Sequence, residues 1–383
     1  MAEVKRRQRR KNRKKLVPGD FWFTVLVLAL VIFGVIMVFS ASYYSALNSS
    51  GSPYTYLIRD LIFAVSGFGI MILFAMIDYH KFMKWAPYLL LLSILLLVLV
   101  VTPLGTEVNG AKRWLGAGVL SIMPGEIAKI CAILAVAAYF GSDPGRILSF
   151  RRGVLPMIAL IGLLCGLVML QPNMSTAITI AGIIVIMMFV AGMQYRYLIG
   201  LFVLGGAGIG ALILAPGGEY RLSRVTTFLD PFKDASGEGY QVVQSLLALG
   251  SGGIFGVGLG KSVQKTLYLP EPQNDFILAV IGEELGFIGI LILMTVYLLL
   301  IWRGIRIALQ APDRFGMLLA SGITSMIGLQ VILNVAVVTS SMPATGVILP
   351  FVSYGGNALW LFMLAAGIML NISRHSKEGV QKR

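Results

Sequence analysis

The stretch of sequence that decides the fold covers residues 269–302 and reads LPEPQNDFILAVIGEELGFIGILILMTVYLLLIW. Its two prolines hold the approach in an extended, non-helical form. From Ile277 to Trp302 the residues are mostly apolar, over a length that crosses a bilayer as a helix. Asp275 falls where that helix would begin. These residues leave two interpretations of Asp275 open: a carboxylate that caps the helix, or a general base at the membrane surface that serves a membrane-bound substrate.

The composition of the whole chain agrees with a membrane helix at this point. The 383 residues are 57% hydrophobic and 13% charged, with a mean hydropathy of +0.85. Only helices or closed barrels satisfy their backbone hydrogen bonds in lipid. The apolar runs are long and continuous and do not alternate residue by residue, which excludes a barrel. The sequence therefore predicts an all-α polytopic membrane protein.

Ten transmembrane helices are predicted, with both termini in the cytoplasm. Under this topology the cytoplasmic segments hold 22 of the 31 Lys and Arg residues, as expected when basic loops set the orientation. The predicted organisation is a basic cytoplasmic tail over residues 1–20, a membrane domain over 21–372 and a cytoplasmic tail over 373–383. The predicted spans are 21–41, 56–77, 86–102, 125–141, 154–171, 175–192, 196–215, 277–302, 315–338 and 352–372.

The charge and the ligand-type residues exclude several classes of function. Nine Lys or Arg residues lie within residues 5–15, and just before a membrane helix such a run is interpreted as a topology signal that contacts anionic lipid, not nucleic acid. Cys131 and Cys165 lie in apolar runs and have neither disulfide nor zinc spacing. His80 and His375 have no ligand partner nearby in sequence. The sequence therefore predicts no metal site built on Cys or His.

Two loops on the predicted outer face contain charged and aromatic residues. The shorter one surrounds Lys112, Arg113 and Trp114. The longer one covers residues 216–276, about 60 residues, which is far beyond an ordinary connection. It is expected to be ordered and packed on the membrane surface, because it contains aromatic residues, both signs of charge and an apolar stretch at Val242–Leu249 that could form an amphipathic or re-entrant helix.

A glycine-rich run at residues 250–262, GSGGIFGVGLGKS, suggests a nucleotide-binding loop at first sight. Its spacing does not fit, because Phe255 stands where a phosphate-binding loop needs its first glycine. No strand precedes the run, and its predicted location is outside the cell. We interpret it as a flexible segment that packs against membrane or substrate.

Several charged residues have two possible roles. Arg suits bidentate phosphate binding, but Arg and Lys at a membrane surface also extend toward lipid headgroups; this applies to Arg221, Arg224, Lys112 and Arg113. Glu126 and Lys129 share one helix face near the start of the fourth span. Charges within a span usually face a cavity or each other, so this is either a structural ion pair or part of a substrate cavity.

The connection between the last two predicted spans, residues 342–357, reads MPATGVILPFVSYGGN. Prolines, glycines and polar side chains among apolar residues indicate irregular backbone. At membrane depth such backbone is tolerated only where it is buried in protein or lines a cavity. We therefore expect this segment to form the floor or wall of a site.

Several of these motifs together resemble the SEDS family of polytopic cell-wall polymerases, over nearly all of the chain after the basic tail. The Pro-Glu-Pro-Gln-x-Asp form and the segment at residues 302–309 resemble the FtsW and SpoVE branch more than the RodA branch. The matching motifs are Leu269-Pro270-Glu271-Pro272-Gln273-Asn274-Asp275-Phe276, Glu283-Glu284-Leu285-Gly286, Arg113-Trp114, Pro124-x-Glu126-x-x-Lys129, Tyr220-Arg221-x-x-Arg224, Asp230-Pro231, Gly239-Tyr240-Gln241 and Pro343-x-Thr345-Gly346-x-x-Leu349-Pro350-Phe351-x-Ser353-Tyr354-Gly355-Gly356.

The resemblance implies a peptidoglycan glycosyltransferase that polymerises lipid II at the outer face of the bacterial cytoplasmic membrane, in septal wall synthesis during division or sporulation. It implies a class B penicillin-binding protein and other division-complex membrane proteins as partners, and no nucleic acid. The essential acid of the family corresponds to Asp275, and its membrane ion pair to Glu126 and Lys129. Glu283 and Ser353, within matching motifs, join the substrate-binding candidates.

The implied chemistry suits these residues. A carboxylate base can take the proton of the attacking sugar hydroxyl, and the lipid pyrophosphate that leaves needs cations placed beforehand. The prediction allows for a divalent cation, Mg²⁺ or Mn²⁺, and includes no organic cofactor. Single displacement would invert the anomeric configuration. The chain departs from the usual family motifs at Asn173, Gly125 and Asn357, which leaves the roles of these positions open.

Three alternative functions stay open. A lipid II flippase would line a path through the middle of the membrane with charges, whereas the carboxylates here gather at the predicted outer edge. A non-catalytic scaffold would depend on its basic tail and not on Asp275. A small-molecule transporter would fit the composition, but no paired inverted halves are recognisable.

Overall fold

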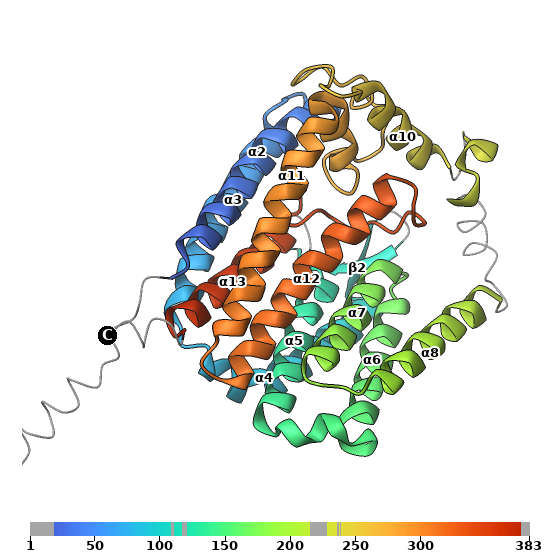
Figure 1. The fold of residues 1–383 in the computed structure, drawn as a ribbon. Helices are drawn as coiled ribbons and strands as arrows, with labels where there is room; N and C mark the ends of the chain where they lie inside the picture. Colours follow the sequence, from blue (N-terminus) through green and yellow to red (C-terminus); the bar gives the residue numbers. More distant parts are fainter. Residues whose placement is uncertain are drawn as a thin grey trace, which may run out of the picture.

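The computed structural model describes residues 19–108, 111–116, 121–214, 228–235, 237 and 239–376. These residues form a helical bundle with one small hairpin (Figure 1). The predicted all-α membrane fold is confirmed. The helices are α2 (Phe21–Ser50), α3 (Thr55–Met76), α4 (His80–Val101), α5 (Pro124–Ser142), α6 (Leu155–Met169), α7 (Met174–Val190), α8 (Tyr195–Leu214), α10 (Tyr240–Gly252), α11 (Ile277–Gln310), α12 (Arg314–Val338) and α13 (Gly356–Arg374), with short turns η2 (Pro144–Leu148), η3 (Phe150–Val154) and η4 (Pro231–Asp234).

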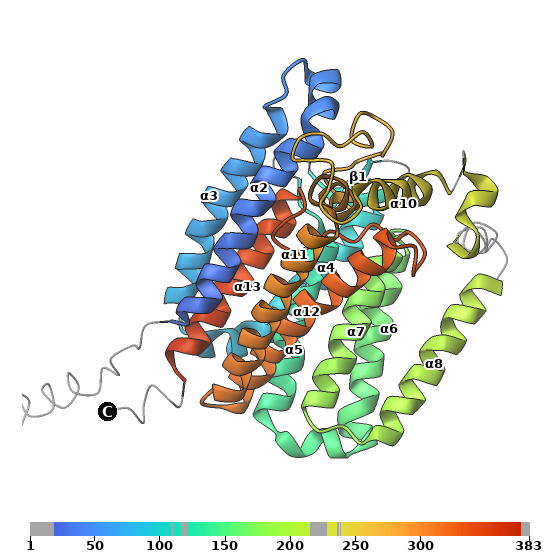
Figure 2. The ribbon, with the colours of Figure 1, turned by 45° about the horizontal axis from the view of Figure 1, so that its top comes forward.

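Each of the ten predicted spans coincides with a helix of the structure. Within the described residues, eight helical segments are long and apolar enough to cross a membrane. The helix α7, with 17 residues, is shorter, and α8 stands at the edge of the bundle in both ribbon views (Figures 1 and 2). The chain is thus a multi-pass membrane protein, and the total of ten spans stays a prediction.

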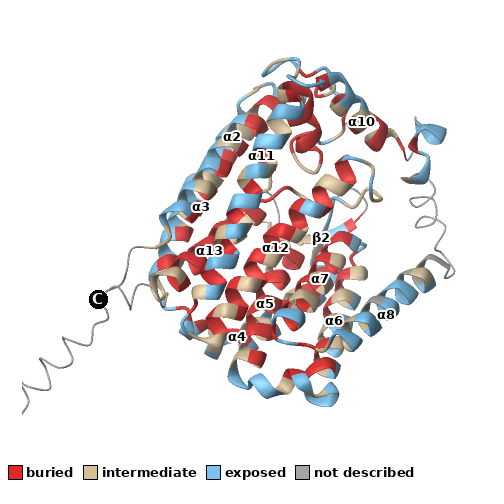
Figure 3. Cartoon of the chain, in the orientation of Figure 1, coloured by how far each residue is buried: buried red, intermediate tan, exposed pale blue. Residues whose placement is uncertain are grey.

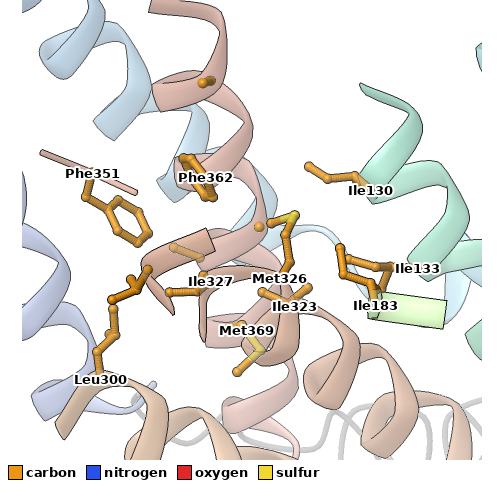
Figure 4. Close-up of a cluster of buried hydrophobic side chains, with 14 of the residues drawn as sticks. Ile130, Ile133, Ile183, Leu300, Ile323, Met326, Ile327, Phe351, Phe362 and Met369 are labelled. Atoms are coloured by element: carbon orange, nitrogen blue, oxygen red, sulfur yellow. The ribbon is translucent and has the colours of Figure 1, made fainter. Parts of the chain in front are cut away.

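The helix α12 forms the centre of the bundle. Most of its own side chains are small or apolar, and most are buried. The helices α5, α7, α11 and α13 pack around it. Figure 3 shows the consequence: α12, α5 and α13 are largely buried, whereas α3 and α8 are largely exposed to what would be lipid. In the close-up of Figure 4, Ile323, Met326 and Ile327 lie between side chains of α5 and α7 and side chains of α11 and α13.

The shorter loop forms a β-hairpin that the sequence analysis did not predict. The strands β1 (Gly105–Val108) and β2 (Ala111–Leu115) pair antiparallel, with an irregularity between Thr106 and Glu107. Leu115 also forms an isolated bridge with Ile122, just before α5. The hairpin therefore fixes Arg113 and Trp114 over the start of α5.

The helix α11 breaks at Gly286, which has φ 68° and ψ −169°. The sequence predicted one continuous span here, so that prediction is wrong in this detail. A break frees backbone groups that need partners. The glycine-rich run supplies them: the N–H groups of Val257 and Gly258 donate to the carbonyls of Glu283 and Glu284 at 2.9 and 3.0 Å, and Phe287 N–H donates to Gly253 O at 2.9 Å.

The longer loop packs on the bundle through one helix, whereas several of its other described side chains, among them Leu229 and Phe255, are exposed. Its predicted helix is confirmed as α10, which lies across the end of the bundle and packs on the first part of α11 (Figure 2). Gly252 of α10 approaches so closely that a Cβ there would lie 2.0 Å from the carbonyl oxygen of Gly282. The loop is therefore anchored on the short helical segment that directly follows Asp275.

At the opposite end of the bundle, the start of α2 meets the end of α13. Asp20 caps α2 by accepting from Phe23 N–H at 2.9 Å, and its own N–H donates to the Ser373 hydroxyl at 3.0 Å. Its carboxylate also pairs with Arg303 of α11 at 2.5 Å. These contacts hold the two ends of the described chain together.

The break in α11 gives the first testable prediction. We expect Gly286→Ala to destabilise the folded state by about 2–3 kcal/mol, because its backbone conformation is open to glycine almost alone, and an added Cβ would lie 2.3 Å from Gly256 N. The matched control is Gly250→Ala in α10, where nothing lies within 4 Å of the added Cβ. Thermal unfolding in detergent should separate the two variants; equal unfolding temperatures would contradict this account of the break.

Candidate functional site

A cavity of about 640 Å³ opens where several chain segments meet at the end of the bundle that carries the hairpin and α10. The segments are the starts of α3, α5, α7 and α13, the strand β2, the loop before α11, and the irregular segment after α12. Five of the predicted site residues line this cavity, from three separate parts of the chain. They are Asp275, Glu126, Lys129, Arg113 and Trp114.

Asp275 faces the cavity and does not cap α11. The N-cap position of α11 is Phe276, and no side chain caps the helix. The helix-cap interpretation of Asp275 is therefore wrong. Among the described residues no hydrogen bond to its carboxylate is found, and a Cβ added at Gly346 would lie 3.1 Å from Asp275 Oδ2. The absence of a side chain at Gly346 thus leaves room for the Asp275 carboxylate.

The surroundings of Asp275 raise its pKa to about 6. Burial is the largest cause, since it disfavours the charged form, and the neighbouring Glu271 carboxylate raises the pKa further. The Arg113 guanidinium acts in the opposite direction. A carboxylate with a pKa near 6 is still ionised at neutral pH, and it is a stronger base than an ordinary aspartate.

Two buried contacts fix the loop that carries Asp275. Asn334 of α12, fully buried, donates through Nδ2 to the backbone carbonyl of Asp275 at 2.8 Å and to that of Val347 at 2.6 Å. Tyr354 N–H donates to Gln273 O at 2.9 Å. The loop before α11 and the segment after α12 are therefore joined side by side. The segment over 342–357 lines the cavity, as its irregular backbone led us to expect.

The Glu126–Lys129 ion pair lies deep in the same cavity. Lys129 Nζ is 2.7 Å from Glu126 Oε2, and the two side chains are 2% and 11% exposed. Both project from the first turns of α5, which packs against α7. Gly125 permits this close packing, because a Cβ there would lie 3.1 Å from Thr176 Cγ2. The pair is thus both a structural element and a part of the cavity wall.

The other predicted residues lie elsewhere. Lys112 is exposed on β2 and does not line the cavity. Glu283 is buried and accepts hydrogen bonds from residues 262–264, and the Ser353 hydroxyl accepts from Leu349 N–H at 2.8 Å. Both hold backbone in place, and neither lines the cavity. Arg221 and Arg224 lie outside the described residues.

The cavity also contains residues that were not among the predicted site residues. Arg59, from the start of α3, lines it together with Gln330 of α12 and the Glu271 carboxylate. A charged residue within a span was a signal for Arg59, since such residues usually face a cavity. Gln330 carried no comparable signal, because one amide in an apolar helix does not indicate which neighbours it will meet.

The three positions that depart from the family motifs have clear structural roles. Asn173 caps α7, since its side chain oxygen accepts from Thr176 N–H at 3.2 Å and from the Ser175 hydroxyl at 3.0 Å. An amide oxygen fills this role without a charge. Asn357 donates to the Ser121 carbonyl and so joins α13 to the segment between the hairpin and α5.

Within the part of the chain that the structure describes, no group of three or more His, Cys, Asp or Glu side chains is placed to hold a metal ion. Two carboxylates, Glu271 and Asp275, line the cavity together. Glu271 Oε2 accepts from the amides of Gln273 and Asn274 at 3.0 and 2.9 Å. Glu271 could therefore supply one carboxylate to an Mg²⁺ ion that takes its other ligands from substrate phosphates and water.

These features define a class: a multi-pass helical membrane protein with a charged cavity at one end of its bundle, in which an ionisable carboxylate faces an ion pair and arginines. Comparison with known proteins gives the family. The FtsW, RodA and SpoVE family, described as cell cycle proteins, matches residues 21–378, and the chain belongs to this family.

Individual relatives extend over almost the whole chain. Stage V sporulation protein E of Bacillus subtilis is 41% identical over 365 residues, covering 95% of this chain and 99% of that protein. The probable peptidoglycan glycosyltransferase FtsW of Geobacter sp. strain M18 is 39% identical over 352 residues, covering 91% and 95%.

Two solved structures share the fold. A chain from a peptidoglycan synthase complex, described as coordinating polymerization and crosslinking, superposes with a TM-score of 0.77 at 29% identity and covers 93% of this chain and 98% of its own. The rod shape determining protein RodA of Thermus thermophilus gives a TM-score of 0.70 at 28% identity, covering 94% and 98%.

The buried ion pair gives the second prediction. Lys129→Met should destabilise the fold by about 3 kcal/mol, because it leaves the Glu126 carboxylate without its partner. The double variant Glu126→Gln/Lys129→Met should recover most of that loss, since no uncompensated charge remains. Thermal unfolding of the three proteins tests this; a double variant no more stable than Lys129→Met would show that pairing is not the reason.

Proposed function

We propose that this protein is a peptidoglycan glycosyltransferase that polymerises lipid II into glycan strands in septal wall synthesis, with Asp275 as general base. The observation that carries the proposal is the ionisable Asp275 carboxylate, which lines a cavity together with Arg59 and Arg113 at one end of a membrane bundle. The names of the relatives support the reaction. The site lies on the outer side of the cytoplasmic membrane under the topology that the basic residues favour.

The proposed chemistry is one displacement. The acceptor sugar hydroxyl is a weak nucleophile, and the Asp275 carboxylate takes its proton as the oxygen attacks the anomeric carbon of the donor. The bond from that carbon to the lipid pyrophosphate breaks, and the pyrophosphate leaves with the electron pair. Attack from the opposite face inverts the α-linked donor to a β-linkage.

The leaving pyrophosphate gains negative charge and needs donors fixed in advance. In the proposed site Arg113 and Arg59 line the cavity and supply planar N–H groups suited to phosphate oxygens. Lys129 is neutralised by Glu126, so this pair orients neutral sugar hydroxyls in our proposal. Lys112 stays a candidate for binding substrate outside the cavity, and Arg221 and Arg224 stay candidates for binding substrate.

A class B penicillin-binding protein is the proposed partner. One structural neighbour belongs to a complex that coordinates polymerization and crosslinking, and a strand made here would need such a cross-linking enzyme. We extend the proposal to other membrane proteins of the division complex. The programme served, division or sporulation, depends on those partners.

The third prediction tests the base. With purified lipid II and the partner present, the wild-type protein should form glycan polymer, and Asp275→Asn should form none above background, because an amide cannot accept the proton. Folding and partner binding of the variant serve as controls. Equal polymer from both proteins would remove Asp275 from the chemistry. No polymer from either would return weight to a flippase or a scaffold.

The fourth prediction concerns pH. The pKa of Asp275 is raised to about 6, so the base is present above that pH and lost as pH falls through it. We expect a polymerisation rate that is level from pH 7 to 8 and falls about tenfold per unit well below pH 6. Polymerisation rates measured at saturating lipid II would show this dependence. A rate that falls only near pH 4 would mean that the Asp275 carboxylate is not buried.

We also propose a divalent cation, Mg²⁺ or Mn²⁺, held by Glu271 and the substrate pyrophosphate and not by Asp275, which stays the base. When bound there, such an ion would neutralise charge on the pyrophosphate. Chelation by EDTA should then stop polymerisation and added Mg²⁺ should restore it. Glu271→Gln should raise the Mg²⁺ concentration needed by about tenfold or more. An undiminished rate in EDTA would exclude the ion.

A further inference from the structure

A second cluster of charged residues is buried apart from the cavity. Lys265 Nζ lies 2.6 Å from Glu284 Oε1, and the two side chains are 2% and 0% exposed. Ser40 of α2 donates to both carboxylate oxygens of Glu284 at 2.7 and 2.8 Å, and lies 2.9 Å from Lys265 Nζ. None of the three residues lines the cavity, and the proposed reaction gives them no task.

The neighbouring carboxylate strengthens the same junction. Glu283 accepts from the Ser262 hydroxyl at 2.5 Å, from Val263 N–H at 2.8 Å and from Gln264 N–H at 3.3 Å. Two successive carboxylates of α11 therefore bind four successive residues of the longer loop. Charges this deeply buried stay in a fold only when their partners are well placed, so the junction has one geometry.

The junction closes a loop around Asp275. Lys265 and Glu284 are the two ends of a segment in which Asp275 lies ten residues after the first and nine before the second. The helix α11 breaks just beyond Glu284, at Gly286. The rest of α11 therefore does not dictate where the short helix that follows Asp275 lies. The buried pair and the contact with α2 through Ser40 help to set that position, together with the packing of α10 and the hydrogen bonds of Asn334.

We propose that Lys265, Glu284 and Ser40 are positioning residues for the general base: their network fixes the closed loop, and so the place of the Asp275 carboxylate, relative to the cavity wall. The inference rests on the proposed role of Asp275. A base must stay within hydrogen-bond reach of the hydroxyl it deprotonates, and a displacement of about 1 Å can cost about a hundredfold in rate.

The test uses a variant that removes the network without leaving a buried charge. Lys265→Met/Glu284→Met replaces the pair by apolar side chains of similar length, a change that folded proteins often tolerate. We expect an unfolding temperature near that of the wild type, kcat for lipid II polymerisation reduced at least thirtyfold, and KM within threefold. Hydrogen exchange of residues 266–276 should become faster, with α12 unchanged.

The pH profile separates positioning from a structural role. In the double variant the loosened loop admits water to Asp275, so the acid limb, expected near the wild-type pKa of about 6, should move toward that of an ordinary aspartate. The matched control is Asp20→Asn/Arg303→Gln, which removes an ion pair at the far end of the bundle. The control should keep the wild-type rate and limb.

A folded double variant with wild-type kcat and acid limb would overturn the inference, as would a loss of kcat no larger than that of the control. If the double variant does not fold, Ser40→Ala removes only the α2 contact; a kcat reduced about fivefold or more supports the inference, and an unchanged kcat overturns it. Asp275→Asn is measured alongside. Activity of that variant would refute the proposed base, whereas the hydrogen-exchange result tests the loop independently.

Discussion

The structure depends on one constraint: backbone groups released from a helix in or near a bilayer must find partners inside the protein. The helix α11 breaks at Gly286, and a glycine-rich segment forms hydrogen bonds with the backbone on both sides of the break. Only glycines allow the two backbones to come this close. The glycine-rich run at residues 250–262 therefore supplies hydrogen-bond partners to the broken helix α11.

The break has a use for the site. If α11 were continuous from Ile277 to Gln310, the packing of its lipid-facing part would determine where its first residues lie. With the break, the first turns of α11 pack with α10 and the longer loop instead. The Asp275 loop is then tied to Val347 through Asn334 and to Tyr354 through Gln273. Chemistry in this fold lies where helices end and polar contacts replace apolar packing.

The sequence predicted well whatever depends on runs of neighbouring residues. Continuous apolar stretches gave the membrane spans, the prolines before Ile277 gave the start of α11, and Val242–Leu249 gave α10. It failed where residues far apart decide. No local pattern pairs Lys265 with Ser40, and the break at Gly286 becomes visible only when its glycine partners are in place. Asp275, Glu126 and Arg113 all line the cavity. Glu283 and Ser353 belong to equally distinctive motifs but do not line it.

The contact of Asp20 with Ser373 and Arg303 joins the two ends of the described chain at one corner of the bundle. Residues 1–18 and 377–383 are attached at this corner, and they carry most of the excess positive charge of the protein. The net positive charge of both segments therefore joins the bundle at the same corner. Salt screens the attraction of that charge to anionic lipid.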